Sequence, residues 1–273
     1  MKKYIIGNLK MNLNTVTERE RYLDWMEKGM KGKKFNDAEI ILCPPYVYLE
    51  SFSQRKNKKI HPVKSSLREV SARGGQFNRV KIGAQNLFQE PKGSFTGEVS
   101  AGMLKAVGCE YVIIGHSERR KYFGETSSLA NQKIKSALKA GIKPIYCFGE
   151  TRAERDGGFI KDVITNQILA AVEGISPMNL EKIIFAYEPV WAVGTDVIPK
   201  VNEILEVRIL WKKILMEKFS AKTIGRTSLL YGGSVKAKWA KEVCLDPEMD
   251  GVLIGRESLV PDEFLKIAEI ISK

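Results

Sequence analysis

Short runs of apolar and β-branched residues alternate along this chain with longer segments whose apolar residues recur at helical spacing. The short runs predict β-strands, and the longer segments predict amphipathic helices. The predicted strands span residues 3–8, 39–43, 80–84, 111–114, 142–148, 183–187, 229–231 and 251–254. The clearest predicted helices span residues 17–30, 126–139, 159–172, 201–219, 236–243 and 262–271.

Eight strands, each followed by a segment long enough for a helix, predict a parallel sheet with right-handed crossovers. No linker rich in Pro, Gly or Ser divides the 273 residues, and this length suits one large domain. We therefore expect residues 1–273 to form a single α/β domain, folded as a closed (β/α)8 barrel and not as an open sheet.

The cysteines and the apolar runs indicate the cellular compartment. Cys43, Cys109, Cys147 and Cys244 lack CxxC spacing, and with only two histidines the chain has few candidate zinc ligands. Scattered cysteines are typical of buried thiols in a reducing compartment. The apolar run near the N-terminus is too short for a signal peptide, and no apolar run is long enough for a transmembrane helix. We expect a cytoplasmic protein with no membrane partner.

Net charge is concentrated in one segment. The chain carries +12, which favours anionic partners, and residues 54–81 alone hold nine Lys or Arg and one Glu. Apart from Phe77 this segment has no aromatic residue on which bases could stack, so we do not expect nucleic acid as a partner. We expect a solvated basic insertion at about residues 54–80. The alternative is a polyanion- or nucleic-acid-binding protein on the same scaffold, using residues 54–81.

Polar residues follow several of the predicted strands directly. In a (β/α)8 barrel the C-terminal ends of the strands meet at one face, where the chemistry takes place. Each residue alone has an ordinary structural explanation, since a strand-end carboxylate often caps a helix and a lone histidine often lies in the core. Their convergence from different strands predicts a site. The residues are Asn8, Lys10, Gly115 to Glu118, Glu188, Tyr231 to Ser234, Gly255 and Arg256.

The chemistry that suits this set is proton abstraction next to a carbonyl group. Glu188 is the candidate base, because a dry pocket strengthens a carboxylate as a base. His116 can donate a hydrogen bond to the carbonyl oxygen, and Lys10 supplies positive charge where negative charge develops. The glycines after the last two strands offer backbone N–H groups for a phosphate. This chemistry uses no metal or organic cofactor.

Several runs of sequence resemble the motifs of the triosephosphate isomerase family, in the same order along the chain. They are GNLKMN at 7–12, AQN at 84–86, FTGEV at 95–99, GHSERR at 115–120 with FGE at 123–125, AYEPVWA at 186–192 with GT at 194–195, YGGSV at 231–235 and DG at 250–251. The resemblance extends from residue 3 to about residue 271. It implies a TIM barrel that interconverts dihydroxyacetone phosphate and D-glyceraldehyde 3-phosphate in glycolysis and gluconeogenesis.

The resemblance also implies roles for particular residues. Glu188 matches the catalytic base, His116 the electrophile, Lys10 and Asn8 the electrostatic and positioning groups, and Glu118 the acid that accompanies the histidine. Residues 189–195 match a mobile lid, in which Gly194 contacts the phosphate. Ser234, Gly255 and the amide of Arg256 complete the phosphate site.

The family is dimeric, and the loop from Gln85 to Glu98 matches the segment that enters the partner subunit. The resemblance implies that Thr96 approaches Asn8 of the partner subunit. Leu87, Phe88 and Phe95 on this loop favour burial at such an interface. We therefore expect a homodimer.

The chain departs from the family pattern at three places. Arg256 stands where many members have glycine, and we expect its N–H to face the phosphate and its side chain to point away from the pocket. Residues 196–199, Asp-Val-Ile-Pro, replace the usual end of the lid and predict a stiffer hinge. Residues 54–80 form a longer connection than is usual in the family.

Overall fold

The computed structural model describes residues 2–35, 37–57 and 76–272. Most of the basic insertion expected at about 54–80 lies outside the described residues, and the expectation that it is a solvated extension stays a prediction.

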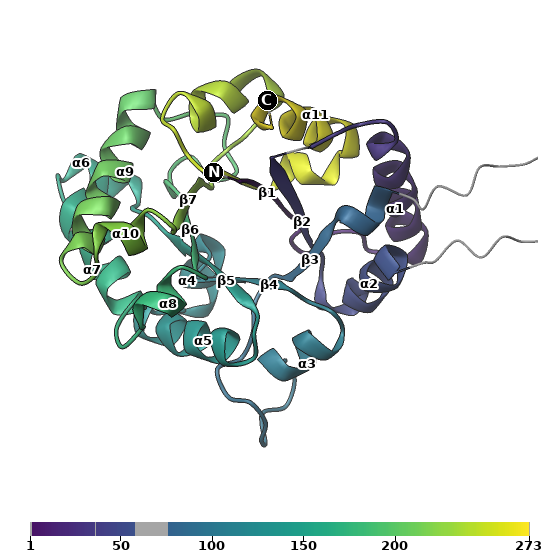
Figure 1. Cartoon of the computed structure of the whole chain (residues 1–273), viewed down its shortest axis with the longest axis horizontal. Coiled ribbons are helices and arrows are strands. Elements are labelled where there is room, and N and C mark those ends of the chain that lie inside the picture. Colours follow the sequence, from purple (N-terminus) through teal and green to yellow (C-terminus); the bar gives the residue numbers. More distant parts are fainter. Residues whose placement is uncertain (1, 36, 58–75, 273) are drawn as a thin grey trace, which may run out of the picture.

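Eight parallel strands form a closed barrel in the order of the chain (Figure 1). Tyr4 lies opposite Gly251, so the first strand pairs with the last and the sheet has no free edge. This confirms the (β/α)8 barrel expected from the alternating pattern. The strands are β1 (Lys3–Asn8), β2 (Ala38–Cys43), β3 (Lys81–Ala84), β4 (Tyr111–Ile114), β5 (Lys143–Phe148), β6 (Ile184–Tyr187), β7 (Ser228–Tyr231) and β8 (Gly251–Ile254).

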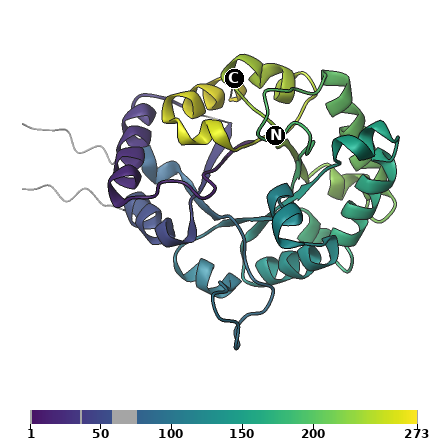
Figure 2. The ribbon, with the colours of Figure 1, turned by 180° about the vertical axis from the view of Figure 1, so that it is seen from behind.

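Helices form a ring around this barrel (Figures 1 and 2). Several begin at a hydroxyl side chain that accepts a backbone N–H of the first turn, as Thr15 does from Glu18 and Thr126 from Leu129. The helices are α1 (Val16–Met30), α2 (Leu49–Asn57), α3 (Ala101–Ala106), α4 (Ser117–Phe123), α5 (Ser127–Lys139), α6 (Arg152–Asp156), α7 (Ile160–Ala171), α8 (Pro177–Leu180), α9 (Val201–Met216), α10 (Ala221–Ile224) and α11 (Pro261–Ile271).

One predicted helix has a different form. Residues 236–243 were expected to be α-helical, but the segment is a 3-10 turn, η3 (Ala237–Trp239), followed by a wide π-helical turn, η4 (Lys241–Leu245). Its apolar side chains at Ala240 and Val243 are nonetheless buried, as the pattern predicted. Periodicity identifies which side chains face the barrel, but it does not distinguish these turns from an α-helix.

Strand residues alternate between two apolar layers. Ile6, Ile113 and Leu230 belong to a cluster that fills the barrel. Their sequence neighbours, such as Ile5 and Val112, belong to the larger cluster between the strands and the helices. Because every second side chain points to the same face of a strand, one apolar run supplies both layers.

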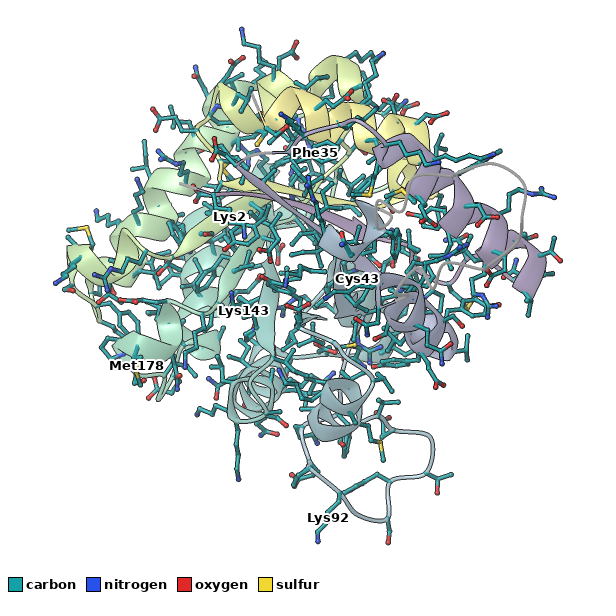
Figure 3. The ribbon with its side chains drawn as sticks, turned by 45° about the vertical axis from the view of Figure 1, so that its right-hand side comes forward. Lys2, Phe35, Cys43, Lys92, Lys143 and Met178 are labelled. Carbon is teal, nitrogen blue, oxygen red and sulfur yellow. The ribbon has the colours of Figure 1, made fainter. Side chains whose placement is uncertain are left out.

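The loop between β3 and α3 projects from the barrel, and Lys92 lies near its tip (Figure 3). Phe95 on this loop is 43% exposed, and its ring lies 4.7 Å from that of Phe88, centroid to centroid. Leu87 is fully buried within its own subunit, so the expectation that it needs a partner for burial was wrong. Phe95 is the residue that still presents apolar surface.

Candidate active site

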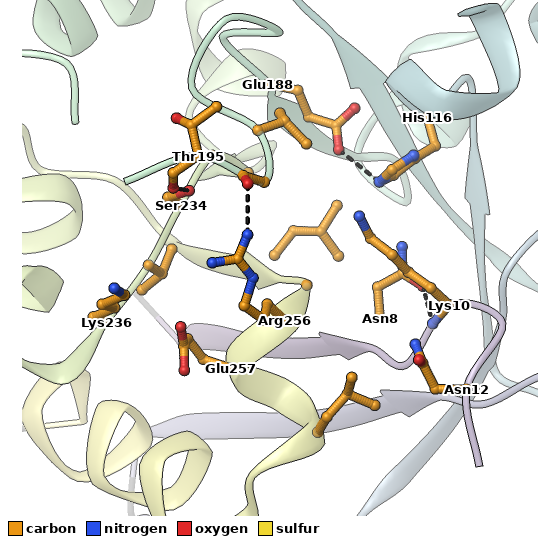
Figure 4. Close-up of a pocket in the computed structure, with 18 residues that line it drawn as sticks. Asn8, Lys10, Asn12, His116, Glu188, Thr195, Ser234, Lys236, Arg256 and Glu257 are labelled. Carbon is orange, nitrogen blue, oxygen red and sulfur yellow. Dashed lines mark hydrogen bonds and ion pairs between the residues drawn. The ribbon is translucent and has the colours of Figure 1, made fainter. Parts of the chain in front are cut away.

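A pocket of about 280 Å³ opens at the C-terminal ends of the strands (Figure 4). It brings together most of the residues that the sequence analysis selected, from five different strand ends. Those lining it are Asn8, Lys10, His116, Glu188, Gly194, Ser234, Gly255 and Arg256. Glu118 does not line the pocket, but it contacts Lys10, which does.

Glu188 follows β6 directly and is 2% exposed. Its Oε2 accepts a hydrogen bond of 2.8 Å from the backbone N–H of Ser117, at the start of α4. Its Oε1 lies 3.1 Å from Nε2 of His116 (Figure 4). The carboxylate is therefore held in a dry position, with one oxygen beside the imidazole.

His116 is the residue that caps α4. Its Nδ1 accepts a hydrogen bond of 3.2 Å from the backbone N–H of Glu118. Because Nδ1 is an acceptor here, the neutral imidazole carries its proton on Nε2. That N–H faces Glu188 and the pocket, where it can donate to an oxygen of a bound molecule.

Lys10 has a left-handed backbone conformation, with φ at +50°. Such a conformation is unfavourable for a residue with a β-carbon. Two side chains hold it: Oδ1 of Asn8 accepts the N–H of Lys10 at 3.1 Å, and the amide of Gln85 donates to its carbonyl at 2.8 Å. The ammonium group contacts Glu118 and reaches the pocket. The surrounding structure thus enforces the position of this charge.

Glycines leave room at the end of the pocket formed by the loops after β7 and β8. A β-carbon at Gly233 would lie 2.2 Å from the hydroxyl oxygen of Tyr231. One at Gly255 would lie 3.2 Å from Cε of Lys10. Lys236 and Arg256 also line this end, so it is positively charged and suits an anion.

The side chain of Arg256 does not point away from the pocket, as the sequence analysis expected. It lines the pocket, and its Nη2 donates a hydrogen bond of 2.6 Å to the carbonyl oxygen of Gly194 (Figure 4). The carbonyl group attracts the guanidinium across the gap between the two loops. This contact could not be expected from the sequence, because the two residues are 62 positions apart.

Residues 189–195 form a series of turns that covers one side of the pocket. The hydroxyl of Ser234 lies within hydrogen-bond distance of two carbonyl oxygens of this segment, those of Ala192 and Thr195. Near the start of this segment, the indole N–H of Trp191 donates a hydrogen bond of 3.0 Å to the buried Glu150. The segment expected as a lid is therefore folded down onto the loop after β7.

Some contacts that shape the site were not predicted from the sequence. The backbone N–H of Ser117 holds the carboxylate of Glu188, and the side chain of Gln85 holds the backbone of Lys10. Ser117 and Gln85 both lie inside recognised motifs, but their contacts depend on the fold. Asn12 and Lys236 also line the pocket. Asn12 is the last residue of the GNLKMN run, and Lys236 directly follows the YGGSV run.

Within residues 2–35, 37–57 and 76–272, no group of three or more His, Cys, Asp and Glu side chains is arranged to hold a metal ion. No helix within these ranges is both long and apolar enough to cross a membrane.

Together, the fold and the pocket define a (β/α)8-barrel enzyme with a buried carboxylate and imidazole beside a cationic end. A sequence model of the family described as "Triosephosphate isomerase" matches residues 3–271. Proteins named triosephosphate isomerase from Dictyoglomus thermophilum and Aquifex aeolicus are both 40% identical to this chain. The alignments cover 98% of this chain and 99% and 98% of those relatives. A third, from Chlorobium phaeobacteroides, is 39% identical, with 98% of each chain covered.

The chain belongs to the triosephosphate isomerase family. This confirms the resemblance that the motifs carried, and with it the class of enzyme, an intramolecular aldose–ketose isomerase. The comparisons give no support to a polyanion-binding protein on this scaffold.

Proposed function

We propose that this pocket interconverts dihydroxyacetone phosphate and D-glyceraldehyde 3-phosphate through an enediolate, as a step of glycolysis and gluconeogenesis. The observation that carries the proposal is the distance of 3.1 Å between Oε1 of Glu188 and Nε2 of His116 at the wall of the pocket. A base and a hydrogen-bond donor so close together can act on a carbon and the oxygen bonded to its neighbour. Family membership supplies the substrate.

Glu188 takes the proton from C1 of the ketose, and the electron pair left behind forms the enediolate. The N–H of His116 donates to the oxygen on which negative charge develops, and the ammonium of Lys10 stabilises the same charge. Glu188 then returns the proton to C2, while the two oxygens exchange one proton. Asn8 and Glu118 act by positioning, since Asn8 holds the backbone of Lys10 and Glu118 contacts its side chain.

The phosphate occupies the cationic end of the pocket. Gly194, Gly255 and Arg256 offer backbone N–H groups, and Ser234 supports the loop that carries Gly194. Fixed amide dipoles bind the phosphate of the substrate and of the intermediate equally well. They therefore orient the reacting carbons, and they do so without a side-chain charge that would slow release of the product.

The enzyme acts as a homodimer through the loop from Gln85 to Glu98. Phe95 presents apolar surface on this projecting loop, which favours burial against a second subunit. The base of the loop touches the site, because the side chain of Gln85 bonds to the carbonyl of Lys10. A partner that orders the loop would therefore also stabilise the position of Lys10.

The cytoplasm is the proposed location, since glycolytic isomerization takes place there. All four cysteines are buried free thiols, which suits a reducing compartment. The reaction is proposed to use no metal and no organic cofactor, because the carboxylate, imidazole and ammonium groups together supply the proton transfer and the charge stabilisation it needs.

A coupled assay in both directions tests the proposal, with Glu188→Gln as the variant that removes the base. We expect kcat to fall by a factor on the order of 10³. Glu181→Gln is the matched control, because Glu181 lies outside the pocket and pairs with the exposed Arg226 at 3.4 Å. Turnover of the Glu188 variant near that of the control would rule out Glu188 as the base.

A further inference from the structure

Two departures from the family pattern, at positions 196 and 256, meet in space. Arg256 donates to the carbonyl of Gly194 at 2.6 Å, and Asp196, two residues further along, pairs with Lys236 at 2.7 Å. Both cationic side chains come from the loops that carry the proposed phosphate site, and both partners lie in the lid. Positions that look like independent changes in the sequence therefore belong to one set of contacts.

We propose that Arg256 and Lys236 form a cationic clasp that holds the lid closed over the phosphate end of the pocket by binding Gly194 and Asp196. In this role Arg256 is a positioning residue and not a ligand of the phosphate. The inference rests on the proposed function, because the clasp matters only if Gly194 serves the phosphate.

The geometry of Gly194 explains why its carbonyl is the useful point of attachment. Gly194 has φ at +72°, a left-handed conformation that glycine adopts without strain, and it joins two peptide groups of the lid. One carries the N–H proposed to face the phosphate, and the other carries the carbonyl that Arg256 binds. Fixing the carbonyl limits the rotation that would turn the N–H away from the pocket.

Electrostatics favour the second contact of the clasp. The hydrogen bond and the charge of Lys236, with smaller contributions from Arg256 and Lys238, hold the pKa of Asp196 below its ordinary value. The carboxylate therefore stays ionised at neutral pH. Its side chain is 69% exposed, so this ion pair alone is weak. Two weak contacts on a segment of three residues act together, because each lowers the entropy cost of forming the other.

Hydrogen exchange of the free enzyme, followed by mass spectrometry on peptides covering residues 190–198, measures the lid directly. We expect exchange in Arg256→Ala and in Asp196→Asn to be about 3- to 10-fold faster than in the wild type. Because each contact supports the other, the effect of the double variant should fall short of the product of the two single effects. A ligand of the phosphate would not alter exchange in the absence of substrate, so unchanged exchange in Arg256→Ala would overturn the proposal.

Matched controls are available on the far side of the molecule. Arg226→Ala removes an exposed guanidinium that pairs with Glu181 at 3.4 Å. Glu173→Gln removes an acid that pairs with Lys218 at 2.7 Å and is 69% exposed, the same values as for Asp196. Neither control should change the exchange of the lid.

Kinetics then separate positioning from direct binding. For Arg256→Ala we expect KM and the inhibition constant of inorganic phosphate to rise together by about 3- to 10-fold, with kcat within about two-fold. A rise of about 100-fold in both, with unchanged lid exchange, would make the guanidinium a ligand and contradict the clasp. The exchange experiment needs no substrate, so absence of isomerase activity in the wild type would refute the proposed function and leave the test of the clasp intact.

Discussion

A β-carbon placed on Gly149 would lie 1.8 Å from the carbonyl oxygen of Glu188. No side-chain atom fits between Gly149 and this oxygen, so the loop after β5 packs directly on the backbone of Glu188, the candidate base. On the side-chain side, a β-carbon on Gly232 would lie 2.9 Å from Cγ of Glu188. The residue is thus confined from two directions by backbone that carries no side chain, and its carboxylate has little freedom to drift.

Gly232→Ala should misplace the carboxylate of Glu188 without preventing folding. The added methyl group meets a side-chain carbon that can shift by a fraction of an ångström, and small misplacements of a base lower kcat by a factor on the order of 100. Gly102→Ala is the control, since its β-carbon would meet only Oγ of Ser100 at 3.8 Å. In α3 that control should stabilise the protein by about 0.5 kcal/mol and leave kcat unchanged. If Gly232→Ala and Gly102→Ala had the same kcat, the close packing around Glu188 would not be what positions its carboxylate.

Glu188→Asp tests the same geometry by shortening the base. Retracting the carboxylate by about one methylene should lower kcat on the order of 100-fold while the variant unfolds at a temperature near that of the wild type. Steady-state kinetics check the expected loss of kcat, and thermal unfolding measured by circular dichroism checks the unchanged unfolding temperature. Near-normal turnover would remove Glu188 from its proposed role.

Isomerase activity should survive removal of metal ions. The proposed mechanism assigns charge stabilisation to Lys10 and His116, so dialysis against EDTA should leave kcat and KM unchanged within error. Activity that is lost in EDTA and restored by a divalent ion would overturn the proposed mechanism.

Phe95→Asp should weaken the proposed homodimer, because it places a charge where apolar surface is expected to be buried. Sedimentation velocity at micromolar concentration should show dimers for the wild type and a shift towards monomers for the variant, with lower activity. Phe159→Asp is the control, as Phe159 is 56% exposed at the start of α7, away from the projecting loop. A fully active wild-type monomer would contradict the interface.

Glu125→Gln should destabilise the protein in a manner that depends on pH. Although burial alone would raise the pKa of Glu125, hydrogen bonds from Lys133 and Arg119 outweigh it and hold that pKa below its ordinary value. Removing the charge leaves the buried ammonium of Lys133 unpaired, which costs about 3 kcal/mol at neutral pH. A carboxylate with a lowered pKa stabilises the folded state fully above its unfolded pKa of about 4.3 and progressively less below it.

The difference in unfolding free energy between wild type and Glu125→Gln should therefore be constant from about pH 6 to 8 and shrink below about pH 4.3. Urea unfolding at several pH values measures it. Glu173→Gln, at an exposed pair, should stay within about 0.5 kcal/mol of the wild type at neutral pH. A difference that persists undiminished at pH 3.5 would contradict the assignment of the lowered pKa.

Much of the barrel could be predicted because its signal is local. The alternation of Ile5 and Ile6 between two apolar layers requires only neighbouring residues, and strand boundaries follow from it closely. The four- and five-residue helices α6, α8 and α10 were missed because they are too short to show a period. The site residues were found through motifs at strand ends, and their proposed roles stay predictions.

Contacts between distant residues could not be predicted. Arg256 was expected to point outward because Gly232, Gly233 and Gly255 indicated that backbone amides hold the phosphate. Its direction is instead set by a carbonyl group on a distant loop, which only the closed barrel brings near. The same holds for Gln85, whose side chain supports Lys10 across 75 positions. Sequence reasoning selected the residues proposed to perform the chemistry, but it did not reveal the contacts that hold them in place.

The left-handed backbone at Lys10 has a consequence for the history and engineering of this protein. Glycine would occupy that conformation without strain, so the backbone geometry offers no reason to keep a lysine there. Apart from the contact with Glu118, the proposed role in turnover is the reason to keep the side chain. A programme of directed evolution that rewarded heat resistance alone would be free to discard it, and with it the ammonium group that the proposed mechanism uses.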